Sequence, residues 1–430
     1  MNGDSKFRPY LLRWALLAVC LLYLLQLWTP LRLSGDSIEL LSVGSSVADG
    51  HGFLDHGQKT RYPPGYPAMV AGLDRLGLAR PWSLVALNAV FLCLGFACAG
   101  WVARNYLQLS GNWATTTLLF TALSFVLIKY FTQPLTDIPF FGASLAALAL
   151  TVRAERELGV SYYVFWAAAL SVSVVSVLIR PTGIALFPCL VWSLGAHLGL
   201  GRILLRNKRL LIGCGALTAL LGAAAAMFLL RTIYVRGALL VFAHQGLGHG
   251  ILDILRFREQ EIGELFLNVP ATKLGPFVPL VRVSGVAGLA VLLVNARHCR
   301  MGTVEAFLTA YLFILLLWPY ADARFWVPVL PLILAELFSA ARPWTFSGWK
   351  KGLSVVYAAA YALMGVAALA YSTWITFSGP KFPLRYGDGK LRATYQAFYS
   401  QRRPDDSAKI DAAGLEVLGR YAGNSSLERR

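Results

Sequence analysis

The sequence predicts an all-α polytopic membrane protein, and three features lead to that fold class. Of 430 residues, 57% are hydrophobic and only 14% are charged, whereas a soluble globular domain is about one-quarter charged because ions cover its surface. Apolar runs of about 20 residues, long enough to cross a bilayer as helices, recur along the chain. Charged residues, proline and glycine separate these runs. Lipid is therefore the expected solvent for most of the chain.

The excess of basic residues points to membrane topology. Lysine and arginine number 39 against 22 aspartates and glutamates, a formal net charge of +17. Basic residues favour cytoplasmic loops and anionic lipid headgroups. We find no RNA- or DNA-binding motif, so we expect membrane lipids and no nucleic acid as partners. The six cysteines lie almost wholly inside apolar runs without a CxxC or Cys/His cluster, which favours core-facing residues over disulfides or metal ligands.

We expect about eleven membrane-spanning helices. The first, at 11–28, has three basic residues at or just before its start (Lys6, Arg8 and Arg13) and lacks a small-residue cleavage site, so we predict an uncleaved anchor. An odd number of spans places the termini on opposite sides. Short basic connectors at 201–209 and 347–351 favour a cytoplasmic N-terminus and an extracytoplasmic C-terminus. The other expected spans are 82–103, 113–129, 135–152, 162–178, 184–199, 210–230, 277–294, 303–318, 325–341 and 352–376.

Three longer polar segments lie on the predicted extracytoplasmic side. They are the first loop at 29–81, a second loop at 231–275 and a C-terminal tail at 377–430. Arg75 and Arg80 flank an apolar segment of the first loop that predicts a short amphipathic helix on the bilayer surface, and 251–268 has similar spacing. The tail is too small and polar to fold as a domain by itself. We therefore expect one membrane domain at 1–376 followed by a short tail.

Charged residues gather at the outer ends of the predicted helices and avoid their middles. A transporter coupled to ions usually has acids or broken helices at the bilayer midplane, and neither is clear here. If the helices form a bundle, the charges share one membrane face. There a carboxylate could take a proton from a hydroxyl acceptor and arginines could stabilise a phosphate leaving group. Equally, each charge could simply mark where water begins. The residues are Asp36, Glu39, Lys59, Arg61, Asp137, Arg180, Asp322 and Arg324.

The first loop carries a motif that resembles a known family. GDSIELLSVGSSVADGHGF at 35–53 and RYPPGYPAMVAGL at 61–73 are similar to the GT-C glycosyltransferase superfamily, in the branch of protein O-mannosyltransferases and the lipid A aminoarabinose transferase. Three later segments resemble the same pattern in order: PLTDIPF at 134–140, IRPTG at 179–183 and ARFWVPVLPLILA at 323–335. The resemblance covers the first two hundred residues and one late helix.

The resemblance implies a membrane glycosyltransferase, a hexosyl- or pentosyltransferase. The donor would be a polyprenyl-phosphate sugar and the acceptor a hydroxyl on a protein, lipid or glycan. The chemistry would take place, with inversion, on the outer face of the bacterial inner (plasma) membrane. Asp36 matches the acidic residue of the first loop that serves as the family's catalytic base, and Asp137 matches the aspartate at the entry to the fourth span. Glu39, one helical turn from Asp36, could share its face.

The same resemblance suggests which residues bind the substrates. Arg180 and Arg324 are the expected ligands of the donor phosphate, with Arg61 as a third. The aminoarabinose transferase branch has Lys-Pro where this chain has Tyr62-Pro63, so Lys59 or Arg61 could supply the positive charge there. The expected sugar contacts are Tyr62, Tyr66 and Tyr320, although aromatic residues are common at membrane interfaces.

Two questions stay open at this point. His51 and His56 with Asp36 or Asp55 have weak metal-ligand spacing, so no cofactor is certain, and a divalent metal is a possibility that the sequence does not favour. The outer charges also fit a lipid-linked sugar flippase or transporter, or a non-catalytic subunit of an envelope glycan assembly complex.

Overall fold

The computed structural model describes residues 8–199, 247–296, 301–318, 320–340, 349–387, 389–400 and 410–423. In this part of the chain the fold is a bundle of helices, and the sheet that is present is a hairpin of two-residue strands, β1 (Leu54–Asp55) and β2 (Gln58–Lys59). The helices of the first half are α1 (Arg8–Leu25), α2 (Gly35–Ala48), α3 (Gly65–Arg75), α4 (Pro81–Asn105), α5 (Gly111–Ala122), α6 (Phe125–Phe131), α7 (Asp137–Ala154), α8 (Val160–Ile179) and α9 (Leu186–His197).

The second half of the described chain is also helical. Its helices are α13 (Leu247–Leu267), α14 (Val278–Ala296), α15 (Thr303–Leu316), α16 (Leu330–Ala340), α17 (Trp349–Thr376), α18 (Phe382–Arg385), α19 (Gly389–Ser400) and α20 (Ala412–Tyr421). Short 3₁₀ helices join several of them: η1 (Gln26–Trp28), η2 (Pro181–Ala185), η3 (Ala271–Lys273), η4 (Gly275–Phe277), η5 (Ala323–Trp326) and η6 (Gly379–Lys381).

Six of these helices are long and apolar enough to cross a membrane. They are α1, α4, α7, α8, α14 and α17, and the pair α5–α6 would add a seventh if it counts as one bent span. The chain is an integral membrane protein, which confirms the predicted fold class. Three other expected spans are shorter helices: α9 has 12 residues, α15 has 14 and α16 has 11. The span expected at 210–230 lies outside the described residues.

The expected helix at 113–129 is interrupted. Its two halves, α5 and α6, meet at a bend of 58°. The side-chain amide of Asn268 donates to the carbonyl of Leu123 (2.9 Å), and its carbonyl accepts from the amide of Phe125 (2.7 Å). Backbone groups inside a bilayer must be satisfied by the protein itself, so Asn268 stabilises the break by replacing the missing helical partners.

The expected span at 325–341 also begins differently. Residues 323–326 form η5, and the α-helix starts only at Leu330. Pro328 and Pro331 contribute to the delay, because proline lacks an amide donor and neither residue can donate the backbone hydrogen bond of a regular helix. The irregular stretch before α16 carries Asp322 and Arg324.

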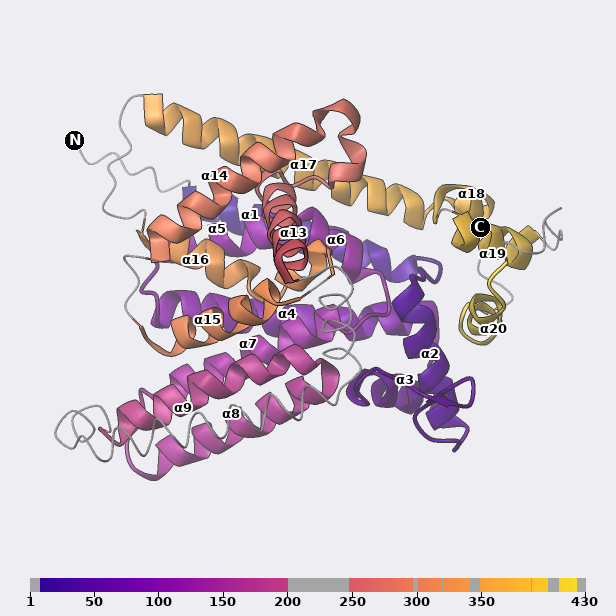
Figure 1. The fold of residues 1–430 in the computed structure, drawn as a ribbon, viewed down its shortest axis with the longest axis horizontal. Coiled ribbons are helices and arrows are strands. Elements are labelled where there is room, and N and C mark those ends of the chain that lie inside the picture. The colour runs from indigo at the N-terminus through magenta and orange to yellow at the C-terminus, as the bar shows by residue number, and fades with distance from the viewer. Residues whose placement is uncertain are drawn as a thin grey trace.

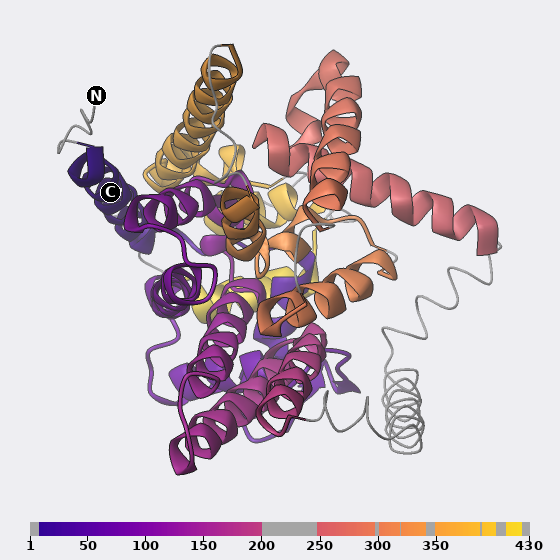
Figure 2. The ribbon, with the colours of Figure 1, turned by 90° about the vertical axis from the view of Figure 1, so that its left-hand side faces the viewer.

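Burial distinguishes the central helix from those at the rim. In the apolar 18-residue stretch of α7, 83% of the residues are buried, against 17% in the corresponding stretches of the spans that contain α1, α14 and α17. Figure 1 shows α4 and α7 in the middle of the bundle, with α17 along one edge and the α8–α9 pair along the opposite edge. Figure 2, turned by 90°, shows α13 projecting outward from the bundle. The rim helices therefore present their apolar side chains to lipid.

The first loop folds into two helices at one end of the bundle. Ser34 caps α2, and its side chain and that of Ser37 bond reciprocally to the backbone in a capping box, which fixes where the helix starts. Pro63 and Pro64 turn the chain into α3. Gly65 then passes so close to α8 that a Cβ atom would lie 2.6 Å from the carbonyl oxygen of Leu178. The loop is thereby fixed against the membrane helices. The amphipathic helix predicted in this loop is α3, and the one predicted at 251–268 is α13.

Candidate active site

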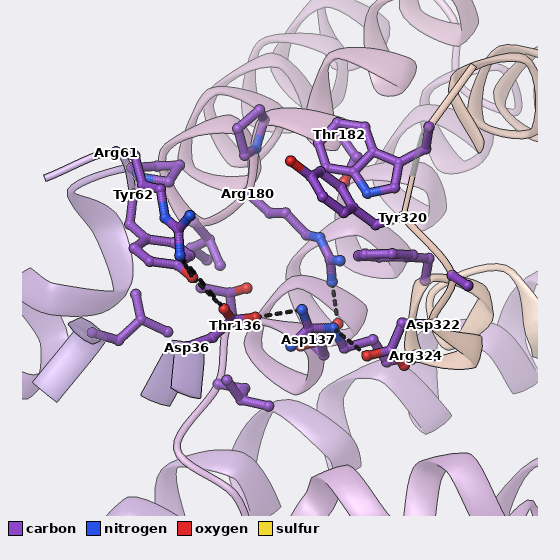
Figure 3. Close-up of a pocket in the computed structure, with 18 residues that line it drawn as sticks. Asp36, Arg61, Tyr62, Thr136, Asp137, Arg180, Thr182, Tyr320, Asp322 and Arg324 are labelled. Atoms are coloured by element: carbon purple, nitrogen blue, oxygen red, sulfur yellow. Dashed lines mark hydrogen bonds and ion pairs between the residues drawn. The ribbon is translucent and has the colours of Figure 1, made fainter. Parts of the chain in front are cut away.

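A cavity of about 380 Å³ lies where five segments meet. They are the start of α2, the turn before α3, the start of α7, the junction of α8 with η2, and the η5 region. Figure 3 shows the charged side chains of these segments converging on the cavity. Its walls are formed by Asp36, Leu40, Arg61, Tyr62, Pro63, Leu135, Thr136, Asp137, Ile179, Arg180, Pro181, Thr182, Trp318, Tyr320, Ala321, Asp322, Arg324 and Phe325.

Asp36 lies in the first turn of α2, where the helix dipole favours an anion. Its carboxylate accepts a hydrogen bond from the Tyr62 hydroxyl (2.6 Å) and forms an ion pair with Arg324, while Arg61 lies 3.9 Å away. Burial alone would raise the pKa of Asp36, but the Arg324 guanidinium and the Tyr62 hydroxyl outweigh it and hold this pKa below its ordinary value of 3.8. The side chain is therefore an anion at neutral pH.

A second carboxylate and a second arginine meet deeper in the wall. Asp137 begins α7 and forms an ion pair with Arg180, which ends α8. Their side chains are only 2% and 9% exposed. A buried ion pair costs desolvation energy that its attraction scarcely repays, so stability is a poor reason to have one here. Two guanidiniums lie near the phenyl ring of Phe325: that of Arg180 is 4.9 Å from the ring centroid and that of Arg324 is 5.3 Å from it.

Arg324 connects the first loop to the late loop, 288 residues apart. Besides its ion pair with Asp36, its Nε lies 3.2 Å from Asp322. Asp322 in turn caps η5 by accepting from the amide of Arg324 (3.0 Å), and it accepts from the hydroxyl of Tyr130 (2.9 Å). The guanidinium is thus held between two carboxylates at the cavity surface.

Eight of the eleven residues selected from the sequence line the cavity: Asp36, Arg61, Tyr62, Asp137, Arg180, Tyr320, Asp322 and Arg324. The other three do not. Glu39 lies behind Arg61 at 3.1 Å, and burial raises its pKa above the usual 4.5 although Arg61 opposes the shift. Lys59 is exposed on β2. Tyr66 is fully buried in the core, because its face of α3 turns inward.

A buried ion pair on α13 was not selected from the sequence. Arg258 and Glu261 are 2.7 Å apart, and both side chains are 4% exposed. Glu261 accepts from the amide of Asp322 (2.7 Å) and from the indole of Trp326 (2.8 Å), while Arg258 donates to the carbonyl of Tyr320 (2.5 Å). Burial raises the pKa of Glu261 to about 7, although Arg258 opposes the shift. The pair therefore holds the backbone at the carbonyl of Tyr320 and the amide of Asp322, together with the indole of Trp326. The sequence signal for this pair was that Arg258 and Glu261 are three residues apart on a predicted helix. That spacing indicates an ion pair but does not show that the pair is buried.

Metal ligands do not gather in the part of the chain that the structure describes. No three His, Cys, Asp or Glu side chains there are arranged to hold an ion. In the cavity, each aspartate faces an arginine. His56 bonds to Asp55 (2.8 Å) and lies 3.4 Å from Glu416 of the tail.

Comparisons with known proteins identify the fold. No family model and no curated protein matches the sequence. Two crystal structures of ArnT from Cupriavidus metallidurans, one bound to undecaprenyl phosphate and one apo, match 96% of this chain and 72% and 77% of theirs, at 15% identity and a TM-score of 0.46. The archaeal oligosaccharyltransferase AglB from Archaeoglobus fulgidus, in complex with an inhibitory peptide and a dolichol-phosphate, matches 98% of this chain at 13% identity and a TM-score of 0.51. The chain spans 61% of the AglB chain. It has the GT-C fold.

Proposed function

We propose that the chain is an integral membrane glycosyltransferase that moves a sugar from a polyprenyl phosphate to a hydroxyl acceptor on the extracytoplasmic face. The observation that carries the proposal is the cavity in which the ionised Asp36 lies beside Arg324, with Arg180 on the same wall. The GT-C fold agrees with it, since AglB with that fold is an oligosaccharyltransferase whose structure holds a dolichol-phosphate.

The charges of the cavity suit a phosphate leaving group. A polyprenyl-phosphate sugar is a phosphodiester with one negative charge, and breaking its bond to the sugar produces a monoester with a charge near −2 at neutral pH. Arg180 and Arg324 would therefore bind the departing phosphate more strongly than the intact donor. Interactions that strengthen in the transition state accelerate the reaction, and guanidiniums can hold phosphate oxygens in pairs. Arg61 would add a third cation at the first loop.

Asp36 is our candidate for the general base. The hydroxyl oxygen of the acceptor forms a bond to the anomeric carbon, the hydroxyl proton passes to Asp36, and the bond from that carbon to the phosphate oxygen breaks with its electron pair leaving on the phosphate. Attack opposite the leaving group inverts the anomeric configuration. Asp137 orients Arg180, and Tyr62 and Tyr320 would contact the sugar. Glu39, Lys59 and Tyr66 lie off the cavity wall, so we assign them no contact with the substrates.

The test is the Asp36→Asn variant. Purified protein in lipid nanodiscs is incubated with radiolabelled polyprenyl-phosphate sugars and membrane envelope fractions as acceptors. Loss of a general base is expected to slow transfer by about 10²- to 10⁴-fold. Binding of polyprenyl phosphate should persist because Arg180 and Arg324 remain. Asp253→Asn is the matched control, since the partner of Asp253 among the described residues is the exposed Arg256 on α13, and this variant should transfer sugar at the wild-type rate.

Two results would contradict the proposal. Wild-type transfer by Asp36→Asn would remove Asp36 from the chemistry. Movement of a lipid-linked sugar across sealed vesicles, without release of polyprenyl phosphate, would favour a flippase instead.

A further inference from the structure

The C-terminal segment packs on the loop that carries Asp36. We call α18, α19 and α20 together the C-terminal clamp, and Figure 1 shows it at the same end of the bundle as α2. Phe382, Tyr395 and Tyr421, one from each helix, are fully buried and belong to the main hydrophobic core. A segment too polar to fold alone therefore completes its packing against the rest of the protein.

Two tyrosines, Tyr395 of the clamp and Tyr386 directly after α18, fix the backbone that leads into α2. The hydroxyl of Tyr395 donates to the carbonyl of Leu31 (2.7 Å) and accepts from the amide of Leu33 (2.8 Å). The hydroxyl of Tyr386 donates to the carbonyl of Leu33 (2.9 Å). These bonds hold the chain three residues before Asp36.

The last helix of the clamp contacts α2 on the other side of Asp36. The hydroxyl of Tyr421 donates to the carbonyl of Leu41 (3.2 Å). A Cβ atom at Gly414 would lie 3.4 Å from the side chain of Ile38, an ordinary van der Waals distance, so α20 packs directly against α2 there. Asp36 thus lies between two stretches of backbone that the clamp contacts.

An arginine of the clamp joins the ends of the two loop helices. Arg420 makes two bonds of 2.7 Å to Asp49, which ends α2, and one of 2.8 Å to Asp74 near the end of α3. Its partial burial and its double contact set it apart from most surface ion pairs, which contribute little. His56 of the same loop lies 3.4 Å from Glu416 of the clamp.

We infer that the C-terminal clamp holds α2 in the position that presents Asp36 to the cavity, and that Arg420 is a positioning residue for this purpose. The inference rests on the proposed function for its catalytic part. A shift of about 1 Å in a catalytic group can slow a reaction by roughly 100-fold. The described hydrogen bonds of Arg420 are with Asp49, at the end of α2, and with Asp74, near the end of α3. Removing its guanidinium would also leave Asp49 and Asp74 as neighbouring unneutralised anions.

The experiment compares Arg420→Gln with Arg420→Lys and the matched control Arg392→Gln. Arg392 lies on α19, and its hydrogen bonds to described residues are both to the carbonyl of Gly387 within the tail. Two quantities are measured in nanodiscs: amide hydrogen exchange over residues 35–48, and kcat and KM for the polyprenyl-phosphate sugar. The first reports how firmly α2 is held in its folded form, without depending on any reaction.

For Arg420→Gln we expect faster exchange over 35–48 and a fall in kcat of about 10- to 100-fold. The KM for the donor should stay within about twofold, because the donor phosphate is assigned to arginines on other elements. Arg420→Lys should restore part of both effects, and Arg392→Gln should match the wild type.

Three results would overturn the inference. One is wild-type exchange and kcat in Arg420→Gln. Another is a fall in kcat while residues 35–48 exchange as in the wild type, and the third is an equal effect of Arg392→Gln. If the wild type transfers no sugar, the proposed function fails, and the exchange rates still decide whether the clamp holds α2.

Discussion

Replacing Arg324 with lysine tests whether a guanidinium, and not merely a positive charge, is needed in the cavity. Arg324 forms an ion pair with Asp36, lies 3.2 Å from Asp322 and stacks 5.3 Å from the ring of Phe325. Lysine keeps the charge but cannot bridge two carboxylates or grip a phosphate with two parallel bonds. Losing one hydrogen bond between charged groups costs about 1.5–3 kcal/mol. At about 1.36 kcal/mol for each factor of ten, kcat/KM should fall roughly 10- to 150-fold.

The loss should appear mainly in kcat, because negative charge grows on the phosphate only as its bond to the sugar breaks. Initial rates of label transfer over a range of donor concentrations separate kcat from KM. The matched control is Arg256→Lys, since the Arg256 side chain on α13 is 71% exposed and lies outside the cavity. A kcat/KM for Arg324→Lys within about threefold of the wild type would refute the assignment, as would a similar loss in the control.

Two further predictions follow from the charges around the cavity. The pH dependence of kcat/KM reports the free protein, and the pKa of Asp36 there lies below 3.8. Its ion pair with Arg324 therefore persists at higher pH and is lost only as the pH falls through that pKa. The rate should accordingly stay level from neutral pH down to about pH 4.5, and an acidic limb centred above 4.5 would instead implicate Glu39, whose pKa is raised from that value. Glu261→Ala should lower the free energy of unfolding by about 3 kcal/mol, because it leaves Arg258 buried without its partner. Thermal unfolding measures this loss, and Asp253→Ala should leave the midpoint unchanged.

Hydropathy predicted where the membrane helices lie but not how they pack. The six long apolar helices occur where the sequence indicated them. The interruption between α5 and α6 could not be predicted, because Asn268, 145 residues further along the chain than Leu123, supplies the bonds that stabilise it. Nor could hydropathy reveal that α7 is central and α14 peripheral. Both are apolar runs, and their burial depends on which neighbours surround them.

The sequence predicted which residues form the site, but not which aspartate forms an ion pair with which arginine. Charge at the outer helix ends, together with the first-loop motif, selected Asp36, Asp137, Arg180 and Arg324. Their pairing depends on how distant segments meet, and the sequence does not contain that geometry in a readable form. The same limit explains Tyr66. A tyrosine in the first loop looks suited to a sugar, but only the packing of α3 determines that its ring faces the core.

The balance of charge in the cavity constrains how the proposed reaction can proceed. Three arginines and three aspartates line it, so its formal charge is zero, which avoids the cost of leaving guanidiniums unpaired in a partly buried site. A donor phosphate that binds Arg324 must therefore compete with Asp36 for the same guanidinium. Because Arg324 is the main opposite charge that lowers the pKa of Asp36, weakening their contact raises that pKa and makes the carboxylate a stronger base. Under this mechanism Asp36 becomes fully effective only when the donor is bound. The acidic limb of kcat should consequently lie at higher pH than that of kcat/KM, since kcat reports the complex and kcat/KM the free protein.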